Sequence, residues 1–205
     1  MDLFENEKRL WDKGYENIAG TDEAGRGPLF GPVVAAAVIL PHDFCLEGLN
    51  DSKKLTEKKR DKYYDYIMEN ALAVEVCIIS AKEIDKINIL EASRKAMTTC
   101  INNLKIKPDY VLTDAMKLNI DIPFEDIIKG DAKSITIAAA SVIAKVTRDR
   151  LLYEYDKKYP EYEFSKHKGY PTKKHIELLE KNGIIDGYRM TFGPVKKILD
   201  KLKED

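Results

Sequence analysis

The sequence has few of the residues that bind zinc or form disulfide networks. It contains three cysteines, Cys45, Cys77 and Cys100, and three histidines among 205 residues. The cysteines are too scattered for a disulfide framework or for a C-x-x-C zinc site. This composition disfavours a disulfide-rich secreted domain and a zinc hydrolase. Cys100 falls on the apolar side of an expected helix, so we predict that it is buried in the core.

Long hydrophobic segments and an excess of charge of either sign are also absent. The longest apolar run, residues 33–40, is too short to span a bilayer. The charged start, MDLFENEKRLWDKG, lacks the hydrophobic region of a signal peptide. The 34 basic and 35 acidic side chains leave a net charge of −1, so a polyanion would have to be bound by local clusters of Lys and Arg. We expect a soluble, cytoplasmic, monomeric protein that does not associate with membranes.

The sequence does contain apolar strands and amphipathic helices that follow one another along the chain. Five short apolar stretches predict strands, at residues 17–22, 33–40, 73–80, 110–113 and 124–129. Apolar spacing of three and four predicts helices over residues 57–69, 89–104 and 135–146. The pattern predicts an α/β fold with a mixed sheet flanked by helices. Residues 1–160 would form the main domain, and residues 161–205 a small helical C-terminal extension packed on it as one structural unit.

Four acidic residues occupy positions where sites commonly form in α/β proteins. Asp22 and Glu23 end the first predicted strand, Asp114 ends the fourth, and Asp131 precedes the Ala-rich helix. Singly, each could be a turn residue or a helix cap. Together they would repel one another unless a cation neutralised them, and a set of oxygen ligands suits Mg²⁺. The four acids therefore favour a metal site beside Gly25-Arg26-Gly27.

The adjacency of Asp22 and Glu23 sets a geometric condition on this hypothesis. Neighbouring side chains of a regular strand point to opposite faces of the sheet. Both carboxylates can meet the same ions only if the chain leaves the strand pleat there. The permissive glycine of Ala24-Gly25 is where we expect that departure.

Basic residues gather in three places. One cluster covers residues 53–62, with Ser52 beside it, and another surrounds Tyr170 in SKHKGYPTKKH. The third consists of Lys145 and Arg148, with Ser141, on one side of the Ala-rich helix and away from its core face. Such patches can hold a phosphate backbone and a stacked sugar or base, although each could also be a solvated helix face. Acids flanked by basic patches are typical of phosphodiester hydrolysis assisted by two metal ions.

With these motifs in view, the chain resembles the bacterial ribonuclease HII family, the type 2 ribonucleases H. The resemblance covers most of the chain in family order. It lies in six segments: GTDEAGRGPLFGPVVAAAV (20–38), NDSKKLTEKKR (50–60), INILEASRKAM (87–97), PDYVLTDAM (108–116), KGDAKSITIAAASVIAKVTRDR (129–150) and HKGYPTKKH (167–175).

The resemblance implies a fold, an activity and a set of catalytic acids. The fold would be RNase H-like, with a helical C-terminal segment. The activity would be endonucleolytic cleavage of RNA in RNA–DNA hybrids and at single ribonucleotides embedded in duplex DNA, leaving 5′-phosphate and 3′-hydroxyl ends. The family acids correspond to Asp22, Glu23, Asp114 and Asp131. They would bind Mg²⁺ or Mn²⁺, with two ions present when substrate is bound.

The resemblance also implies residues that contact the substrate. Gly25, Arg26 and Gly27 would approach the 2′-hydroxyl at an RNA–DNA junction, and Tyr170 would stack on the neighbouring deoxyribose. Contacts to the nucleic-acid backbone are implied for five further residues: Ser52, Lys53, Asn88, Ser141 and Lys145.

The chain departs from the family pattern at two places near its end. The stretch YRMTF (188–192) stands where the family has a His-Arg pair ahead of the Phe, and the tail PVKKILDKLKED lacks the paired aromatics of a sliding-clamp motif. Two alternative functions stay open on the residues alone. One is another RNase H-like nuclease, such as a junction resolvase or an exonuclease. The other is a catalytically idle module that binds hybrids through its basic patches.

Overall fold

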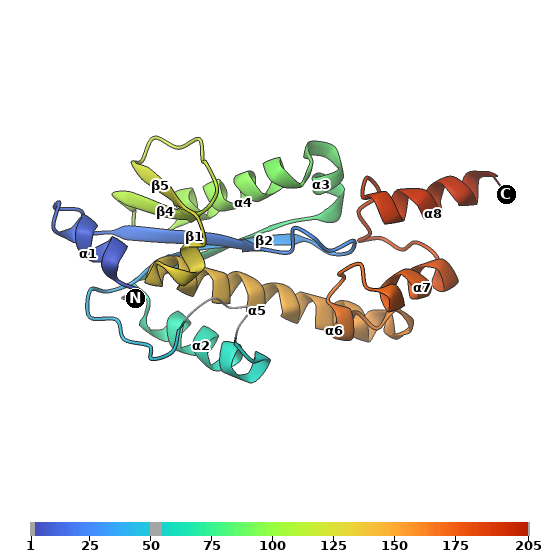
Figure 1. Ribbon diagram of the computed structural model, residues 1–205, viewed down its shortest axis with the longest axis horizontal. Helices are drawn as coiled ribbons and strands as arrows, with labels where there is room; N and C mark the ends of the chain where they lie inside the picture. Colours follow the sequence, from blue (N-terminus) through green and yellow to red (C-terminus); the bar gives the residue numbers. More distant parts are fainter. Residues whose placement is uncertain (1–2, 50–54, 205) are drawn as a thin grey trace.

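A five-stranded mixed sheet forms the centre of the computed structural model, which describes residues 3–49 and 55–204 (Figure 1). The strands are β1 (Ile18–Ala24), β2 (Val33–Ile39), β3 (Ala73–Ile79), β4 (Tyr110–Asp114) and β5 (Phe124–Ile127). Their order across the sheet is β3-β2-β1-β4-β5. The pairs β1–β2 and β2–β3 are antiparallel, whereas β1–β4 and β4–β5 are parallel. The sheet therefore joins an antiparallel half to a parallel half at β1.

Helices cover both faces of this sheet (Figure 1). The helices before the C-terminal segment are α1 (Glu5–Trp11), α2 (Glu57–Asn70), α3 (Ala81–Ile87), α4 (Ile89–Asn103) and α5 (Ile135–Lys158). Helices α3 and α4 lie on one side of the sheet, and α5 lies on the other side with α2 packed against it. The predicted α/β fold, with its mixed sheet flanked by helices, is confirmed.

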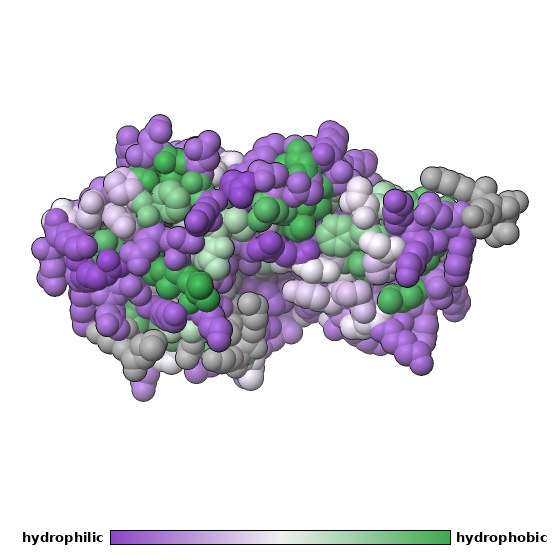
Figure 2. All heavy atoms as spheres, turned by 45° about the horizontal axis from the view of Figure 1, so that its top comes forward, coloured by the Kyte–Doolittle hydropathy of each residue, from purple (hydrophilic) through white to green (hydrophobic). Residues whose placement is uncertain are grey.

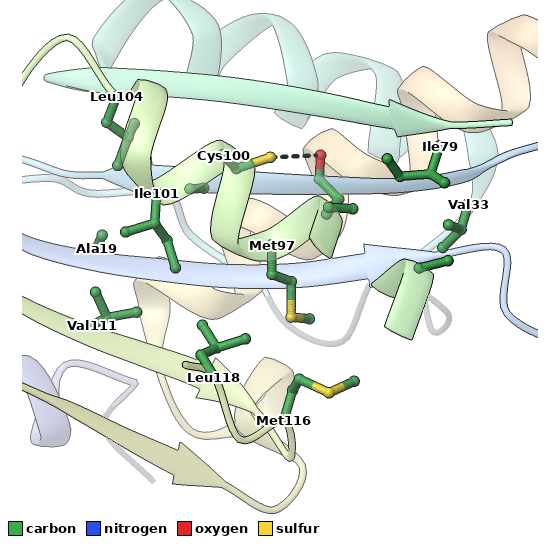
Figure 3. Packing of buried hydrophobic residues seen from close by; sticks show 14 of the residues in the cluster. Ala19, Val33, Ile79, Met97, Cys100, Ile101, Leu104, Val111, Met116 and Leu118 are labelled. Carbon is green, nitrogen blue, oxygen red and sulfur yellow. Dashed lines mark hydrogen bonds between the residues drawn. The ribbon is translucent and has the colours of Figure 1, made fainter. Parts of the chain in front are cut away.

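The first core layer lies between α4 and the sheet (Figure 3). Met97, Cys100 and Ile101 of α4 are buried there against the strands. The Cys100 thiol donates a hydrogen bond to the Ala35 carbonyl in β2, with 3.3 Å between sulfur and oxygen. Every residue of β2 is buried because both faces of that strand are covered. The prediction that Cys100 is a core residue is confirmed.

The second core layer depends on small residues that let α5 approach the sheet closely. Ala138 and Ala139 are completely buried between the helix and the strands. At Gly20 of β1, a side-chain Cβ would lie 2.2 Å from the Thr136 main-chain carbon, which no packing could accommodate. The glycine in β1 and the alanines of α5 therefore let the helix backbone lie directly over the central strand.

The C-terminal segment, residues 161–204, packs on the loop between β1 and β2 and on the far end of α5 (Figure 1). It contains α6 (Phe164–His167), α7 (Lys173–Asn182) and α8 (Gly193–Glu204), preceded by the short 3₁₀ helix Pro160–Tyr162. Phe30, from the β1–β2 loop, is completely buried and stacks on Phe164 with 3.9 Å between ring centroids. The segment thus shares a hydrophobic cluster with the main domain.

The surface in view is mostly hydrophilic, with small separate hydrophobic areas (Figure 2). In the described part of the chain, no helix combines the length and the apolar character that crossing a membrane requires.

Candidate active site

Three carboxylates meet where β1 and β4 run side by side. Asp22 lies in β1, Asp114 is the last residue of β4, and Asp131 lies in a 3₁₀ helix, Gly130–Ala132, ahead of α5. Thr21 pairs with Thr113 in the parallel ladder, so the residue that follows each of them comes to the same point of the sheet. Oxygen atoms of the three carboxylates lie within 4.8 Å of one another.

Main-chain hydrogen bonds fix the orientation of two of these acids. The Gly130 amide donates to Asp114 Oδ1 at 2.7 Å, and the Glu23 amide donates to Asp22 Oδ1 at 2.7 Å. Asp131 does not cap α5. The Ser134 hydroxyl does, since it accepts a hydrogen bond from the Ile137 amide at 3.2 Å. The alternative interpretation of Asp131, as the residue that caps α5, is therefore wrong.

The group of acids is buried and mutually repulsive. Asp22 and Asp131 are 6% and 5% exposed. Burial raises the pKa of Asp22 well above its ordinary value, and the negative charges of Glu23 and Asp114 raise this pKa further. A divalent cation among the carboxylates would remove this repulsion. A buried set of carboxylate oxygens without histidine or cysteine suits Mg²⁺ or Mn²⁺.

Glu23 approaches the site from a different direction. Strand β1 stays paired through Ala24, with Glu23 opposite Ala35, and the chain leaves the pleat at Gly25, where φ is +98°. This departure comes after both acids, so it does not turn Glu23 to the side of Asp22. By strand alternation, the Glu23 side chain starts from the opposite face to Asp22, and it is not part of the three-carboxylate group. Its Oε1 lies 3.4 Å from Arg26 Nη1. Glu23 nevertheless lines the same pocket as Asp22.

That pocket brings most of the predicted substrate-binding residues next to the acids. Its lining consists of Asp22, Glu23, Ala24, Gly25, Arg26, Gly27, Ser141, Lys145 and Tyr170. Tyr170 is 41% exposed, so a large part of its side chain is accessible. One open pocket is therefore lined by carboxylates, glycines, a hydroxyl group, basic side chains and an aromatic ring.

The two glycines of the GRG loop, residues 25–27, differ in what surrounds them. Gly25 has a φ of +98°, and a Cβ there would lie 2.1 Å from Arg148 Nε. A Cβ on Gly27 would lie 3.5 Å from the edge of the Tyr170 ring, which is ordinary contact. Gly25 is therefore required by the fold itself, whereas a methyl group on Gly27 could be accommodated against Tyr170.

Basic side chains around the pocket are held in defined positions. Lys145 Nζ lies 2.5 and 2.6 Å from the two carboxylate oxygens of Asp149, and Arg60 Nη2 lies 4.0 Å from the same carboxylate. Arg148, expected on an open helix face, is instead 1% exposed. The C-terminal segment covers that face of α5, and Arg148 Nη1 donates to the Lys168 carbonyl at 3.0 Å.

Asn88, a predicted contact residue, is not among the described residues that line this pocket. Asn88 lies between α3 and α4, where its Oδ1 accepts hydrogen bonds from the amides of Leu90 and Glu91. Ser52 and Lys53 lie outside the described residues. Arg189, which the sequence analysis did not single out, donates hydrogen bonds to the carbonyls of Gly25 and Arg26, two residues that line the pocket. The sequence pointed to residues 188–192, which include Arg189, only because they depart from the family pattern.

Comparisons with known proteins agree on one family. The family model "Ribonuclease HII" matches residues 19–193. Ribonuclease HII of Bacillus mycoides (strain KBAB4) is 54% identical over 201 residues, which are 98% of this chain and 77% of that protein.

Two solved structures extend the likeness to three dimensions. The ribonuclease H2 of Pyrococcus horikoshii OT3 superposes with a TM-score of 0.82 at 28% identity, covering 92% of this chain and 100% of that one. The RNase HII in a PCNA complex from Archaeoglobus fulgidus gives a TM-score of 0.74 at 27% identity, covering 86% and 95%. The chain therefore belongs to the ribonuclease HII family and is a type 2 ribonuclease H, an endonuclease.

Proposed function

We propose that the enzyme cleaves the RNA strand of RNA–DNA hybrids and also cuts on the 5′ side of single ribonucleotides embedded in duplex DNA. The products would carry 5′-phosphate and 3′-hydroxyl ends. One observation carries this proposal: Asp22, which belongs to the group of three acids, lines a single pocket together with Glu23, the GRG loop and Tyr170. Chemistry at a phosphate and recognition of one sugar can therefore take place side by side.

Asp22, Asp114 and Asp131 are the residues that would hold the metal ions, Mg²⁺ or Mn²⁺, with Glu23 contributing from the adjoining face. Their oxygens are close enough to share an ion, and their burial makes an added positive charge favourable. Two bound ions supply an activated water and stabilise the departing 3′-oxygen. The chain's own part is to fix the carboxylates on β1, on β4 and on the 3₁₀ turn, so that little rearrangement is needed when substrate arrives.

The GRG loop would recognise the ribose. The 2′-hydroxyl is what distinguishes RNA from DNA at a given nucleotide. A main-chain amide can approach it closely only where no side chain intervenes, and Gly27 has no side chain of its own and lines the pocket. Tyr170 lines the same pocket and presents an accessible ring, on which the deoxyribose of the next nucleotide would stack, since that sugar lacks the hydroxyl.

Side chains around the pocket would hold the nucleic-acid backbone. Ser141 and Lys145 line the pocket, and we propose that they contact phosphates. We keep Asn88, Ser52 and Lys53 as proposed contacts, the last two outside the described residues. The A. fulgidus relative was solved with PCNA, but the tail of this chain lacks the paired aromatics of a clamp motif, and we propose no clamp partner for it.

One assay tests the proposal directly. A duplex with a single embedded ribonucleotide, an RNA–DNA hybrid and an all-DNA duplex of the same sequence are incubated with enzyme in Mg²⁺ and in Mn²⁺, and the cuts are mapped to the nucleotide. We expect cleavage 5′ of the ribonucleotide, cleavage within the hybrid's RNA and none in plain DNA. Cutting of plain DNA would favour a resolvase or exonuclease. Binding without cleavage in either metal would favour an idle hybrid-binding module.

A further inference from the structure

Arg189 belongs to the C-terminal segment, yet its guanidinium is buried under the GRG loop. The side chain is completely buried. Nη2 donates to the Gly25 carbonyl at 2.6 Å, and Nη1 donates to the Arg26 carbonyl at 2.9 Å. Nε donates to the Gly31 carbonyl at 3.0 Å. One side chain thus binds main-chain oxygens at both the start and the end of the turn that follows β1.

Burying the Arg189 guanidinium costs free energy, which points to a specific role for this side chain. Burial, with the positive charge of Arg148 nearby, lowers the pKa of Arg189 to about 9. A buried cation is destabilising unless strong hydrogen bonds compensate it. Here the compensating acceptors are three main-chain carbonyls, which bind the guanidinium in a fixed orientation. Lysine, a point charge without the planar fork, could not bind all three in the same way.

The carbonyls bound by Arg189 determine where the amides of the loop point. No cis peptide bond occurs in the described residues. In a trans peptide, the carbonyl of one residue and the N–H of the next point in opposite directions. The carbonyls of Gly25 and Arg26 point towards Arg189, so the N–H groups of Arg26 and Gly27 point away from it. Both residues are exposed and line the pocket.

These two amides are also available to a ligand. Within residues 3–49 and 55–204, no main-chain carbonyl accepts a hydrogen bond from the N–H of Arg26 or Gly27. Two successive exposed amides on one side of a turn make a concave donor site for an oxygen atom. The loop therefore presents donors to the pocket because its acceptors are bound from behind.

The residue before Arg189 supports the other side of the pocket. His175 Nδ1 lies 2.8 Å from the Tyr170 carbonyl and so donates to it, because a carbonyl can only accept. Burial lowers the pKa of His175 to about 4, so the ring is neutral and its Nε2 accepts from the Tyr188 hydroxyl at 2.9 Å. Tyr188 and Arg189 thus hold Tyr170 and the GRG loop from one segment.

We propose, on the basis of the function proposed above, that Arg189 is a positioning residue for ribose recognition. By binding the carbonyls of Gly25 and Arg26, it aims the amides of Arg26 and Gly27 at the sugar hydroxyl of the substrate. The segment in which this chain departs from the family pattern is the one that sets the geometry of the recognition loop.

The test compares cut positions as well as rates. Arg189→Lys and Arg189→Gln are assayed on a duplex with one ribonucleotide and on a duplex with a short ribonucleotide tract flanked by DNA. We expect cleavage rates about 10- to 100-fold below wild type, because misplaced amides of the GRG loop would misalign the scissile phosphate. We also expect cuts within the tract to spread to other positions. The Tyr188→Phe variant removes one hydroxyl and keeps the ring, and we expect a smaller shift in the same direction.

Leu179→Ala is the matched control. Leu179 is completely buried in the same C-terminal segment, in the cluster around Phe30, and it makes no hydrogen bond to the GRG loop. This variant should melt at a lower temperature than wild type and keep the wild-type cut pattern. Folded Arg189 variants with the wild-type cut pattern, at any rate of cleavage, would overturn the positioning role. A wild-type enzyme that leaves the single-ribonucleotide duplex uncut would instead overturn the proposed function.

Discussion

Asp22 is a buried carboxyl group that lies close to other negatively charged carboxylates. Its pKa is raised above the ordinary value of 3.8 by burial and by two neighbouring carboxylates. A carboxyl with a raised pKa binds its proton more tightly in the folded chain than in the unfolded chain. Its contribution to stability is therefore greatest at low pH and declines as the pH rises above the ordinary value. Without metal, ionised Asp22 destabilises the fold near neutral pH.

Replacing this carboxylate should therefore separate stability from activity. In metal-free buffer near neutral pH, Asp22→Asn should melt at a higher temperature than wild type, and the difference should shrink towards about pH 4. Added Mg²⁺ or Mn²⁺ should raise the melting temperature of wild type far more than that of the variant. Cleavage should fall by at least about 100-fold, more than the usual cost of losing a group that only supports a ligand.

Asp126→Asn is a suitable control, because Asp126 is an exposed acid on the edge strand β5. It should leave melting, metal response and cleavage unchanged. An Asp22→Asn enzyme that cleaves like wild type would contradict the assignment of Asp22 to the metal site.

The glycines of the GRG loop give a second prediction at this scale. Gly27→Ala should fold with wild-type stability, to within about 0.5 kcal/mol, because the added methyl group meets nothing closer than ordinary contact. Its cleavage of a single embedded ribonucleotide should fall by roughly 10-fold or more, because the methyl group occupies the space for the sugar. Thermal melting and steady-state kinetics on the same preparations measure both quantities.

Gly25→Ala should behave in the opposite way. Its positive φ and the clash with Arg148 make the alanine unfavourable in the free protein, so the melting temperature itself should drop. Equal stabilities for the two variants would contradict the different environments assigned to the two glycines.

At the scale of elements, the turn between α3 and α4 depends on Asn88. Its φ of +67° is uncommon outside glycine, and its side chain caps α4 through the amides of Leu90 and Glu91. Asn88→Ala should lose the cap and strain the backbone, lowering the free energy of unfolding by about 2 kcal/mol. Asn88→Gly tolerates the backbone conformation and should lose only a few tenths of a kcal/mol. Denaturant unfolding measures both.

The same pair of variants tests the proposed contact of Asn88 with substrate. If the side chain touches the nucleic-acid backbone, Asn88→Gly should bind a hybrid more weakly than wild type despite its near-normal stability. Unchanged binding by this variant would leave Asn88 as a helix cap alone.

Local patterns in the sequence were enough to predict the principal elements, and tertiary contacts explain what was missed. The strands and α2, α4 and the start of α5 follow from apolar periodicity. Helix α1 has no side-chain cap of its own. It is anchored by the buried carboxylate of Glu7, which accepts hydrogen bonds from the hydroxyls of Ser134 and Thr136. These partners lie far along the chain, so no local pattern reveals them.

In the candidate site, too, local patterns predicted some residues and tertiary contacts explain those that were missed. Asp22, Asp114 and Asp131 were singled out from their positions at strand and helix ends, and the fold brings them together. The burial of Arg148 was not foreseen, because helical periodicity assigns a residue to a face and cannot tell which distant segment covers that face. Arg189 was missed for the same reason, since its partners lie more than 150 positions away along the chain.

At the scale of the molecule, we propose that the C-terminal segment and the main domain form one cooperative unit. The hydrophobic cluster around Phe30 contains residues of both, and Arg148 and Arg189 bind carbonyls across the boundary. Leu179→Ala should therefore lower the midpoint of a single unfolding transition, by several degrees for a loss of about 2–5 kcal/mol. Calorimetry with fluorescence as a second probe would detect a separate early transition, which would show that the segment unfolds independently.

The contact between Arg189 and Gly25 spans 164 positions of the chain. On the ribosome, the acids of β1 are made well before Arg189, whose guanidinium binds carbonyls of the adjoining loop. At roughly 5–20 residues per second, that interval is on the order of ten seconds. A nascent chain that has not reached position 189 therefore lacks the hydrogen bonds that hold the carbonyls of Gly25 and Arg26. If Arg189 positions the loop as proposed, ribose recognition would be established only after the four acids of the site have been made.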